Sequence, residues 1–312
     1  MTAARQLHPV PAVALVGAVL GIGSYLVAVT RAGVTARVAG QRLGLAAITV
    51  APLRRARRLL GQQVTTTERP DSATWVLAPA AYAGLAALAL SVVPLGPGTA
   101  VADVDTGIVV FGAAEVLAVV AFYLHGWSPN SPLALAAGYR HVAAALSYAL
   151  LSMFVLIAAA LPAQSLGIGA IVDSQAGLWN VLRQPLGLPL LLVVALGVTA
   201  SGPLDLLDGT DLAGGGGAED SGVQRLAWEG ARAAMLLAFA AGAAAVFLGG
   251  WHGPLLPGWA WMALKTAAVA GLLVVVQVQG ARVSAERFVA VSWTVLLPLA
   301  FLDLLAAGVV AL

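Results

Sequence analysis

Roughly eight apolar stretches, each long enough to cross a lipid bilayer, follow one another along this 312-residue chain. Apolar residues make up 60% of the sequence and charged residues 10%, a balance that does not suit a surface facing water on all sides. Backbone polar groups inside lipid must hydrogen-bond within the protein, so we expect the spans to be helices. The sequence therefore predicts an all-α, polytopic membrane bundle that forms a single integral membrane domain over residues 1–312.

Each predicted span has about the 20 residues that the hydrocarbon core of a bilayer requires. We place the spans at residues 11–30, 73–93, 106–125, 139–161, 186–202, 230–250, 259–279 and 290–311. The N-terminal apolar run is interpreted as the first span and not as a removed signal peptide, because a short core followed by a small-residue cleavage site is missing.

Arginines indicate which connecting segments share a side of the membrane. Of the 16 Lys and Arg residues, eight lie between Arg31 and Arg69, in the first inter-span segment. Four more lie in or beside the third, fifth and seventh segments: Arg140, Arg225, Arg282 and Arg287. By the positive-inside rule the first, third, fifth and seventh segments are cytoplasmic, and with an even number of spans both termini are outside. We expect a multi-pass protein of the bacterial cell membrane. Most of its basic residues mark the cytoplasmic segments and do not indicate binding to nucleic acid.

The first segment also predicts an amphipathic helix within residues 37–60. Its basic side chains are Arg54, Arg55, Arg57 and Arg58, and its apolar ones are Leu53, Ala56, Leu59 and Leu60. Such a helix lies in the interface between lipid and water. It is either a topological anchor at anionic headgroups or one wall of a site that faces the membrane surface.

The fifth segment is an acidic loop beside otherwise basic ones. Around four glycines it carries Asp205, Asp208, Asp211, Glu219 and Asp220. These carboxylates could bind cations, meet a basic partner or feed a proton path, and sequence alone leaves the three interpretations open.

A few charged residues lie inside the predicted spans, where each is costly and by default a functional candidate. Glu115 lies near the middle of the third span, and it is either a proton-relay group or a protonated side chain bonded to a neighbouring helix. Glu229 is spaced to pair with Arg225 and Arg232 on one helix face. Lys265 either snorkels outward or belongs to a buried polar path, and Asp303 is best explained as an interior polar contact.

The sequence contains no cysteine, which excludes disulfides, thiolate metal sites and cysteine-bound iron–sulfur clusters on this chain. Its four histidines show no metal-ligand spacing, and no phosphate-binding loop, dinucleotide fingerprint or Ser-His-Asp pattern is present. We therefore predict no metal site and no catalytic residues, and any redox cofactor must lie on another polypeptide.

Several blocks resemble the H subunit of respiratory complex I, the NADH-quinone oxidoreductase, and its equivalent in membrane-bound hydrogenases and formate hydrogenlyases. GWSPNSPLALAAGYRHVAAALSYAL (126–150) resembles a family block that begins with GW and NS and ends with SYE. GPLDLLDGTDL with AEDSG (202–222) resembles the family's RPPFDLPEAE with TEYSG, and RVAGQRLG (37–44) its R-x-Q-x-R-x-GP turn. The resemblance covers nearly the whole chain.

The resemblance implies a membrane-arm subunit that helps form the quinone chamber and couples electron transfer to proton translocation. Arg37, Gln41 and Arg42 would border the quinone chamber. Quinone would be a substrate shared with partner subunits, and the partners would be other membrane-arm subunits and the iron–sulfur subunits of the hydrophilic arm. The candidates for a proton path, from charge and resemblance together, are Glu115, Arg140, Asp205, Asp208, Asp211, Glu219, Glu229 and Lys265.

The chain departs from the family pattern at several positions. Ala149 replaces the glutamate of SYE, Ser201 the arginine of RPPFDL, and Asp220 the tyrosine of TEYSG. These departures favour an alternative, in which the chain is the membrane anchor of a hydrogenase-type or formate hydrogenlyase-type complex without a quinone step. The electron donor, the electron acceptor and the occurrence of proton pumping are not encoded in this one sequence.

Overall fold

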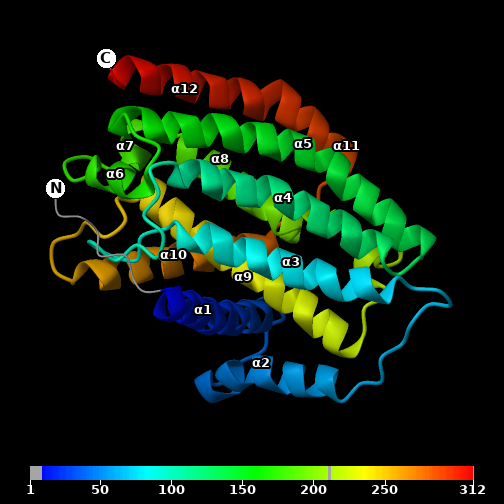
Figure 1. The fold of residues 1–312 in the computed structure, drawn as a ribbon. Helices are drawn as coiled ribbons and strands as arrows, with labels where there is room; N and C mark the ends of the chain where they lie inside the picture. Colours follow the sequence, from blue (N-terminus) through cyan, green and yellow to red (C-terminus); the bar gives the residue numbers. More distant parts are fainter. Residues whose placement is uncertain (1–8, 210–211, 312) are drawn as a thin grey trace.

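The computed structural model describes residues 9–209 and 212–311, and within these ranges the chain is helical and contains no strand (Figure 1). The helices are α1 (Pro9–Val38), α2 (Leu45–Leu60), α3 (Ser72–Ser91), α4 (Gly107–Trp127), α5 (Pro132–Ala160), α6 (Ile168–Asp173), α7 (Asn180–Arg183), α8 (Gly187–Val198), α9 (Gly222–Phe247), α10 (Gly258–Gln279), α11 (Ala285–Val291) and α12 (Leu297–Ala311). A π-helical turn, Ser292–Leu296, joins α11 and α12 into one rod. The all-α prediction is confirmed.

Seven of the predicted spans are helices long and apolar enough to cross a membrane within the described chain. The span predicted at 186–202 is the exception, because its helix, α8, has only 12 residues. At 1.5 Å per residue α8 is roughly 18 Å long, against a hydrocarbon core of about 30 Å. The rest of this crossing is made by irregular chain, which a membrane tolerates only where protein surrounds it.

Helix α9 lies at the centre of the bundle. All of residues 233–247 are buried, and the helix packs against α1, α2, α3, α8 and α10. Most of this stretch is alanine, and small side chains let neighbouring helix backbones approach closely in a membrane protein. On the far side, α5 packs against α4, α8 and α12.

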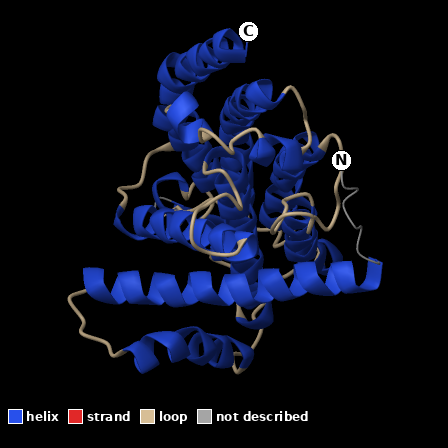
Figure 2. Cartoon of the chain, turned by 90° about the vertical axis from the view of Figure 1, so that its left-hand side faces the viewer, coloured by secondary structure: helices blue, strands red, loops and turns tan. Residues whose placement is uncertain are grey.

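Helix α1 is long and lies across the others. It has 30 residues, which is roughly 45 Å, and a helix longer than the bilayer core is accommodated by tilting. Figure 2 shows it running crosswise below the bundle, with α2 beneath it. Helix α2 confirms the predicted amphipathic helix, with Leu59 buried while Leu53 and Leu60 remain exposed.

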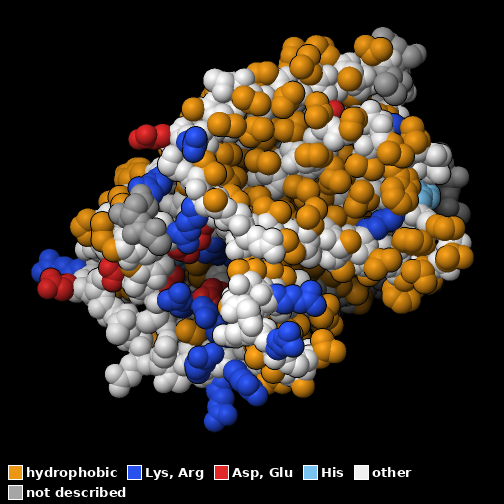
Figure 3. Space-filling view, turned by 180° about the vertical axis from the view of Figure 1, so that it is seen from behind, with side chains coloured by type: hydrophobic (Ala, Val, Ile, Leu, Met, Phe, Trp, Pro, Cys, Tyr) orange, Lys and Arg blue, Asp and Glu red, His pale blue; other side chains and the backbone are white. Residues whose placement is uncertain are grey.

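Hydrogen bonds group the first, third, fifth and seventh connecting segments at one end of the bundle. Ser221 Oγ accepts from the Thr65 amide at 2.8 Å, and the amides of Asp71 and Val283 donate to the carbonyls of Ser128 and Pro203. The start of α1 and the end of α12 lie at the opposite end (Figure 1). In Figure 3 the charged side chains gather at one end, while apolar side chains cover most of the rest of that face. The grouping matches the expected topology, and the assignment of this end to the cytoplasm stays a prediction.

Two glycines bring α4 and α5 into close contact. A Cβ atom on Gly126 would lie 2.7 Å from the Ala134 carbonyl oxygen and 2.9 Å from the Gly138 Cα. Both atoms belong to backbone, which cannot rotate away as a flexible side chain can. The GW and AAGYR segments therefore depend on the missing side chain at position 126.

Gly126→Ala should destabilise the protein by about 1–3 kcal/mol, the usual cost of overpacking. Gly84→Ala is the matched control, because a Cβ atom there meets nothing within 4 Å. The measurement is the temperature at which the detergent-extracted protein loses its native tryptophan fluorescence. Equal melting temperatures for the two variants would contradict the packing argument.

Candidate functional site: a charged cavity held by a half-length helix

The short helix α8 ends inside the bundle with a left-handed residue. Ala200 has a φ of 42°, and the Ser201 amide donates to the Leu196 carbonyl at 3.2 Å. This is the Schellman type of helix end, in which glycine normally takes the left-handed position. The chain is thereby turned out of the helix before it has crossed the membrane.

Two side chains from other helices bind the carbonyl groups at this end. Tyr82 on α3 donates its hydroxyl to the Val198 carbonyl at 2.7 Å. Arg232 on α9 donates from Nε to the Thr199 carbonyl at 3.1 Å and from the guanidinium to the Ala200 carbonyl. A cation at a helix C-terminus also opposes the negative end of the helix dipole.

The other end of α8 faces a carboxylate. A Cβ atom on Gly187, the first residue of α8, would lie 3.2 Å from Asp303 Oδ2. Asp303 is only 3% exposed, and negative charge is favourable at a helix N-terminus. The polar contact expected of Asp303 is not seen, because its buried Oδ2 atom has no hydrogen-bond partner among the described residues.

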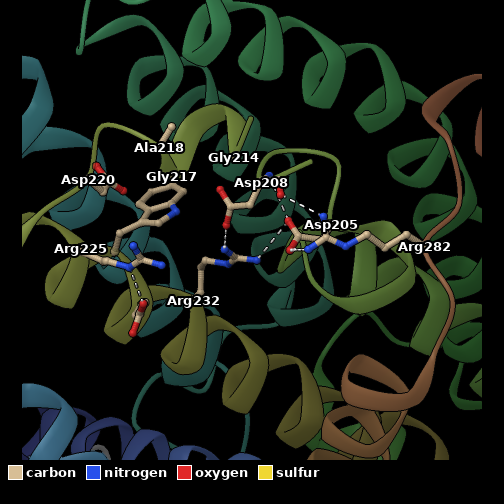
Figure 4. A pocket seen from close by; sticks show the side chains of 11 residues that line it. Asp205, Asp208, Gly214, Gly217, Ala218, Asp220, Arg225, Arg232 and Arg282 are labelled. Atoms are coloured by element: carbon tan, nitrogen blue, oxygen red, sulfur yellow. Dashed lines mark hydrogen bonds and ion pairs between the residues drawn. The ribbon is translucent and has the colours of Figure 1, made fainter. Parts of the chain in front are cut away.

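The same arginine holds the acidic loop. Arg232 binds Asp208 at 2.7 Å and lies 3.7 Å from Asp205, and Arg282 lies 3.5 Å from Asp205 on the opposite side. These groups line a cavity of about 420 Å³ together with Arg225 and residues of the glycine-rich turn (Figure 4). Burial raises the pKa of Asp205, against the opposing effect of Arg232. A carboxylate of raised pKa beside water is suited to take up and release protons.

At the rim of the cavity, Glu229 ties α2 to α9. It accepts two hydrogen bonds from Arg55, at 2.5 and 2.8 Å, and one from Arg225 at 3.1 Å. The bidentate contact raises the pKa of Arg55. The predicted pairing of Arg225 with Glu229 is present, whereas Arg232 turns away from Glu229 to Asp208 and the α8 carbonyls.

A second acidic group of the loop is fully enclosed. Asp220 lies 3.1 Å from Nε2 of His125 on α4 and accepts a hydrogen bond from Trp75 Nε1 at 3.1 Å. The Trp228 ring stacks on His125 at a centroid distance of 3.8 Å. Sequence analysis missed this cluster, since its members are far apart in the chain and share no spacing.

Glu115 lies away from the cavity, deep between α4 and α5. It is 1% exposed, and its Oε2 atom accepts a hydrogen bond from Ser152. Its Oε1 atom has no hydrogen-bond partner among the described residues. This arrangement is compatible with both interpretations of Glu115, the relay and the bonded carboxylic acid.

Lys265 is buried at the opposite end of the bundle. It is 6% exposed and donates to the carbonyls of Gly250 and His252 at 2.9 and 2.7 Å, with the Trp179 ring centroid 4.2 Å away. It therefore does not snorkel, but the structure does not bring it together with the acidic loop either.

The remaining candidates lie around the end that carries the cavity. Arg37, Gln41 and Arg42 are exposed at the turn between α1 and α2, while Arg140 and Glu219 are partly buried. Asp211 lies outside the described residues.

A partly buried hydrogen-bond network surrounds Ser201. Ser201 accepts a hydrogen bond from Gln277 at 2.7 Å, and Gln277 in turn accepts one from Arg31 on α1 at 2.8 Å. The Arg31 guanidinium on α1 is thus linked to Ser201 through the side chain of Gln277.

These features define a multi-pass helical membrane protein in which a charged loop enters the bundle beside a helix of half length. A family model described as NADH dehydrogenase matches residues 10–308. One of the NADH-quinone oxidoreductase H subunits of Rhodopseudomonas palustris (strain HaA2) is 34% identical over 253 residues, 79% of each chain. The chain belongs to the H subunit family of NADH-quinone oxidoreductase.

Two further relatives agree. The H subunit of the Syntrophotalea carbinolica enzyme is 29% identical over 94% of this chain and 93% of its own. One of the H subunits of Cereibacter sphaeroides is 34% identical over 81% of this chain and 80% of its own. The expected family membership is confirmed over nearly the whole length.

Arg232→Met should release the acidic loop, because it removes the α8 cap and leaves the partly buried Asp208 without its cation. Breaking a fully buried pair typically costs about 3–5 kcal/mol, and the cost here should be smaller because Asp208 is partly exposed. Hydrogen–deuterium exchange of the 199–209 amides, followed by mass spectrometry, should be strongly accelerated. Arg225→Met is the control, since that side chain is 47% exposed, and equal exchange in both variants would contradict the capping role.

Proposed function

We propose that this chain is the H subunit in the membrane arm of an NADH-quinone oxidoreductase, where it helps form the quinone chamber and couples electron transfer to proton translocation. The observation that carries this proposal is the partly buried Arg232–Asp208 pair, which lies at the same end of the bundle as the α1–α2 turn. The family match over residues 10–308 supports it, and the relatives named above are all subunits of NADH-quinone oxidoreductase.

The quinone chamber would lie where α1, α2 and α9 meet. Arg55 holds α2 to Glu229 on α9, and α1 packs against both helices. Arg37, Gln41 and Arg42 are exposed at the adjoining turn, where a partner from the hydrophilic arm could cover them. Apolar helix faces would take the quinone tail from the lipid, and the polar turn would meet the headgroup.

Coupling would run through the buried charges. A change of charge at the chamber alters the electrostatic energy of Asp205, Asp208 and Arg232, because charges interact strongly where water is limited. Glu115 would receive the proton deeper in the bundle. Electrons would travel on partner subunits, since iron–sulfur clusters need thiolate ligands and this chain has no cysteine.

The protein should be extracted together with membrane and iron–sulfur partners and should show no turnover alone. Charged helices at one end and the absence of any cysteine ligand on the chain give the reason. Native mass spectrometry of the detergent extract identifies the partners, and NADH-oxidising or hydrogenase subunits among them would separate the two complexes considered. A monodisperse, catalytically active monomer would contradict the proposal.

Glu115→Gln should assemble normally and lose most proton-coupled activity, because glutamine keeps the shape and hydrogen bonding but releases no proton. Glu115→Asp should retain part of the activity. Proton uptake and electron transfer are measured together in membrane vesicles. Glu286→Gln makes the same change at an exposed site and serves as the control. If Glu115→Gln retains full coupling, the relay role is contradicted and Glu115 is a buried structural residue that only forms a hydrogen bond.

A further inference from the structure

The four arginines of α2 divide into two groups. Arg55 turns inward and binds Glu229 on α9. The other three, which we call the basic face of α2, are Arg54, Arg57 and Arg58. They are exposed, and none of them forms an ion pair with a carboxylate of the described chain. Three positive charges on one face without a counter-charge indicate a surface that binds an anion.

A hollow of about 520 Å³ lies over the basic face, lined by its three arginines and by Gly61. Gly61 follows the last residue of α2 and adds no side chain that would fill the hollow. In Figure 3 basic side chains project at the bottom of the molecule, at the height of α2 in Figure 1. An anionic group therefore has room beside three guanidinium groups.

Exposed leucines adjoin the basic face. Leu53 and Leu60 are seven residues apart, which places them on the same side of the helix, and they are 56% and 60% exposed. Arg57 follows Leu53 by four residues and precedes Leu60 by three, so it neighbours both. Apolar and basic side chains that lie next to each other suit the boundary where acyl chains meet headgroups.

The rest of α2 fixes the direction of these two faces. Leu59 is buried, and the helix packs on α1 and α9. Together with the Arg55–Glu229 contact, this packing turns the basic face and the exposed leucines away from the bundle. Figure 2 shows α2 lying beneath α1, outside the bundle. The segment that contains α2 is predicted to be cytoplasmic, and the cytoplasmic leaflet carries the anionic lipids.

We propose that the outward side of α2 binds the phosphodiester headgroup of an anionic phospholipid. The basic face holds the headgroup, since a guanidinium group can donate two parallel hydrogen bonds to phosphate oxygens. Leu53 and Leu60 lie beside the acyl chains. A lipid supplies negative charge and apolar chains at one level of the membrane, whereas an acidic protein surface would match the charge alone. The site uses neither Arg55 nor the charged cavity, so the inference does not rest on the proposed function.

The test is a lipid titration of the full chain in nonionic detergent, followed by native mass spectrometry, which resolves each bound lipid. The probes are anionic phosphatidylglycerol and zwitterionic phosphatidylcholine. Arg54→Gln with Arg57→Gln is the variant. Arg69→Gln with Arg287→Gln is the control, because it removes the same charge at two other exposed sites. We expect the variant to bind the first phosphatidylglycerol about 25-fold more weakly than the wild type, roughly fivefold for each arginine near an anionic lipid. The control should bind it as the wild type does.

Melting temperatures of the variants show whether both remain folded. If the double variant does not fold, Arg58→Gln carries the test, with an expected loss of about fivefold. Equal affinity of the wild type for the two lipids would overturn the proposal, and so would an equal loss in the variant and the control.

Two further measurements distinguish other occupants of the basic face. Glycerophosphate has a phosphate but no acyl chains, and we expect it not to displace phosphatidylglycerol at equal concentration. Displacement would show a site for a soluble anion and overturn the lipid site. Loss of partner subunits from the extracted complex of the double variant, with lipid binding unchanged, would assign the face to an acidic protein surface instead. None of these measurements needs turnover, so failure of the proposed function would leave their result standing.

Discussion

A helix that stops half way across a bilayer leaves its last carbonyl groups without partners, and the surrounding protein must supply them. In this chain Arg232 and Tyr82 do so for α8. Because the same guanidinium also binds Asp208, the helix end and the acidic loop are held by one side chain. The place of the cavity in the bundle follows from this arrangement, and so does the exposure of its carboxylates to water.

Helix α9 makes the arrangement possible through two properties of its sequence. Its first half places Arg225, Glu229 and Arg232 on one face, at spacings of four and three residues, so that α2 and the acidic loop are fixed by the same helix. Its second half is rich in alanine and is buried throughout, which lets neighbouring helices approach it closely. The first half of α9 thus makes the charged contacts with α2 and the acidic loop, and the second half packs against neighbouring helices.

Much of the fold could be predicted from the sequence, because a long run of apolar residues directly indicates a helix that spans the membrane. The seven long helices, the amphipathic α2 and the contact between Arg225 and Glu229 depend on local spacing. The length of α8 could not be predicted, since the apolar run 186–202 gives no sign that Ala200 turns left-handed. The Asp220–His125 contact could not be predicted either, because it joins segments that are far apart in the chain.

The half length of α8 has an electrical consequence. Asp208 is 27% exposed at the side chain. Where water fills the cavity at this level in the membrane, the insulating part of the membrane is thinner than elsewhere. A membrane potential then falls across a shorter distance, and low-dielectric walls focus the field on it. The work of moving one charge across the whole field is about 2.3 kcal/mol per 100 mV. Most of that work would be concentrated on the protein between the cavity and the opposite surface, so a short displacement of charge there would respond steeply to voltage.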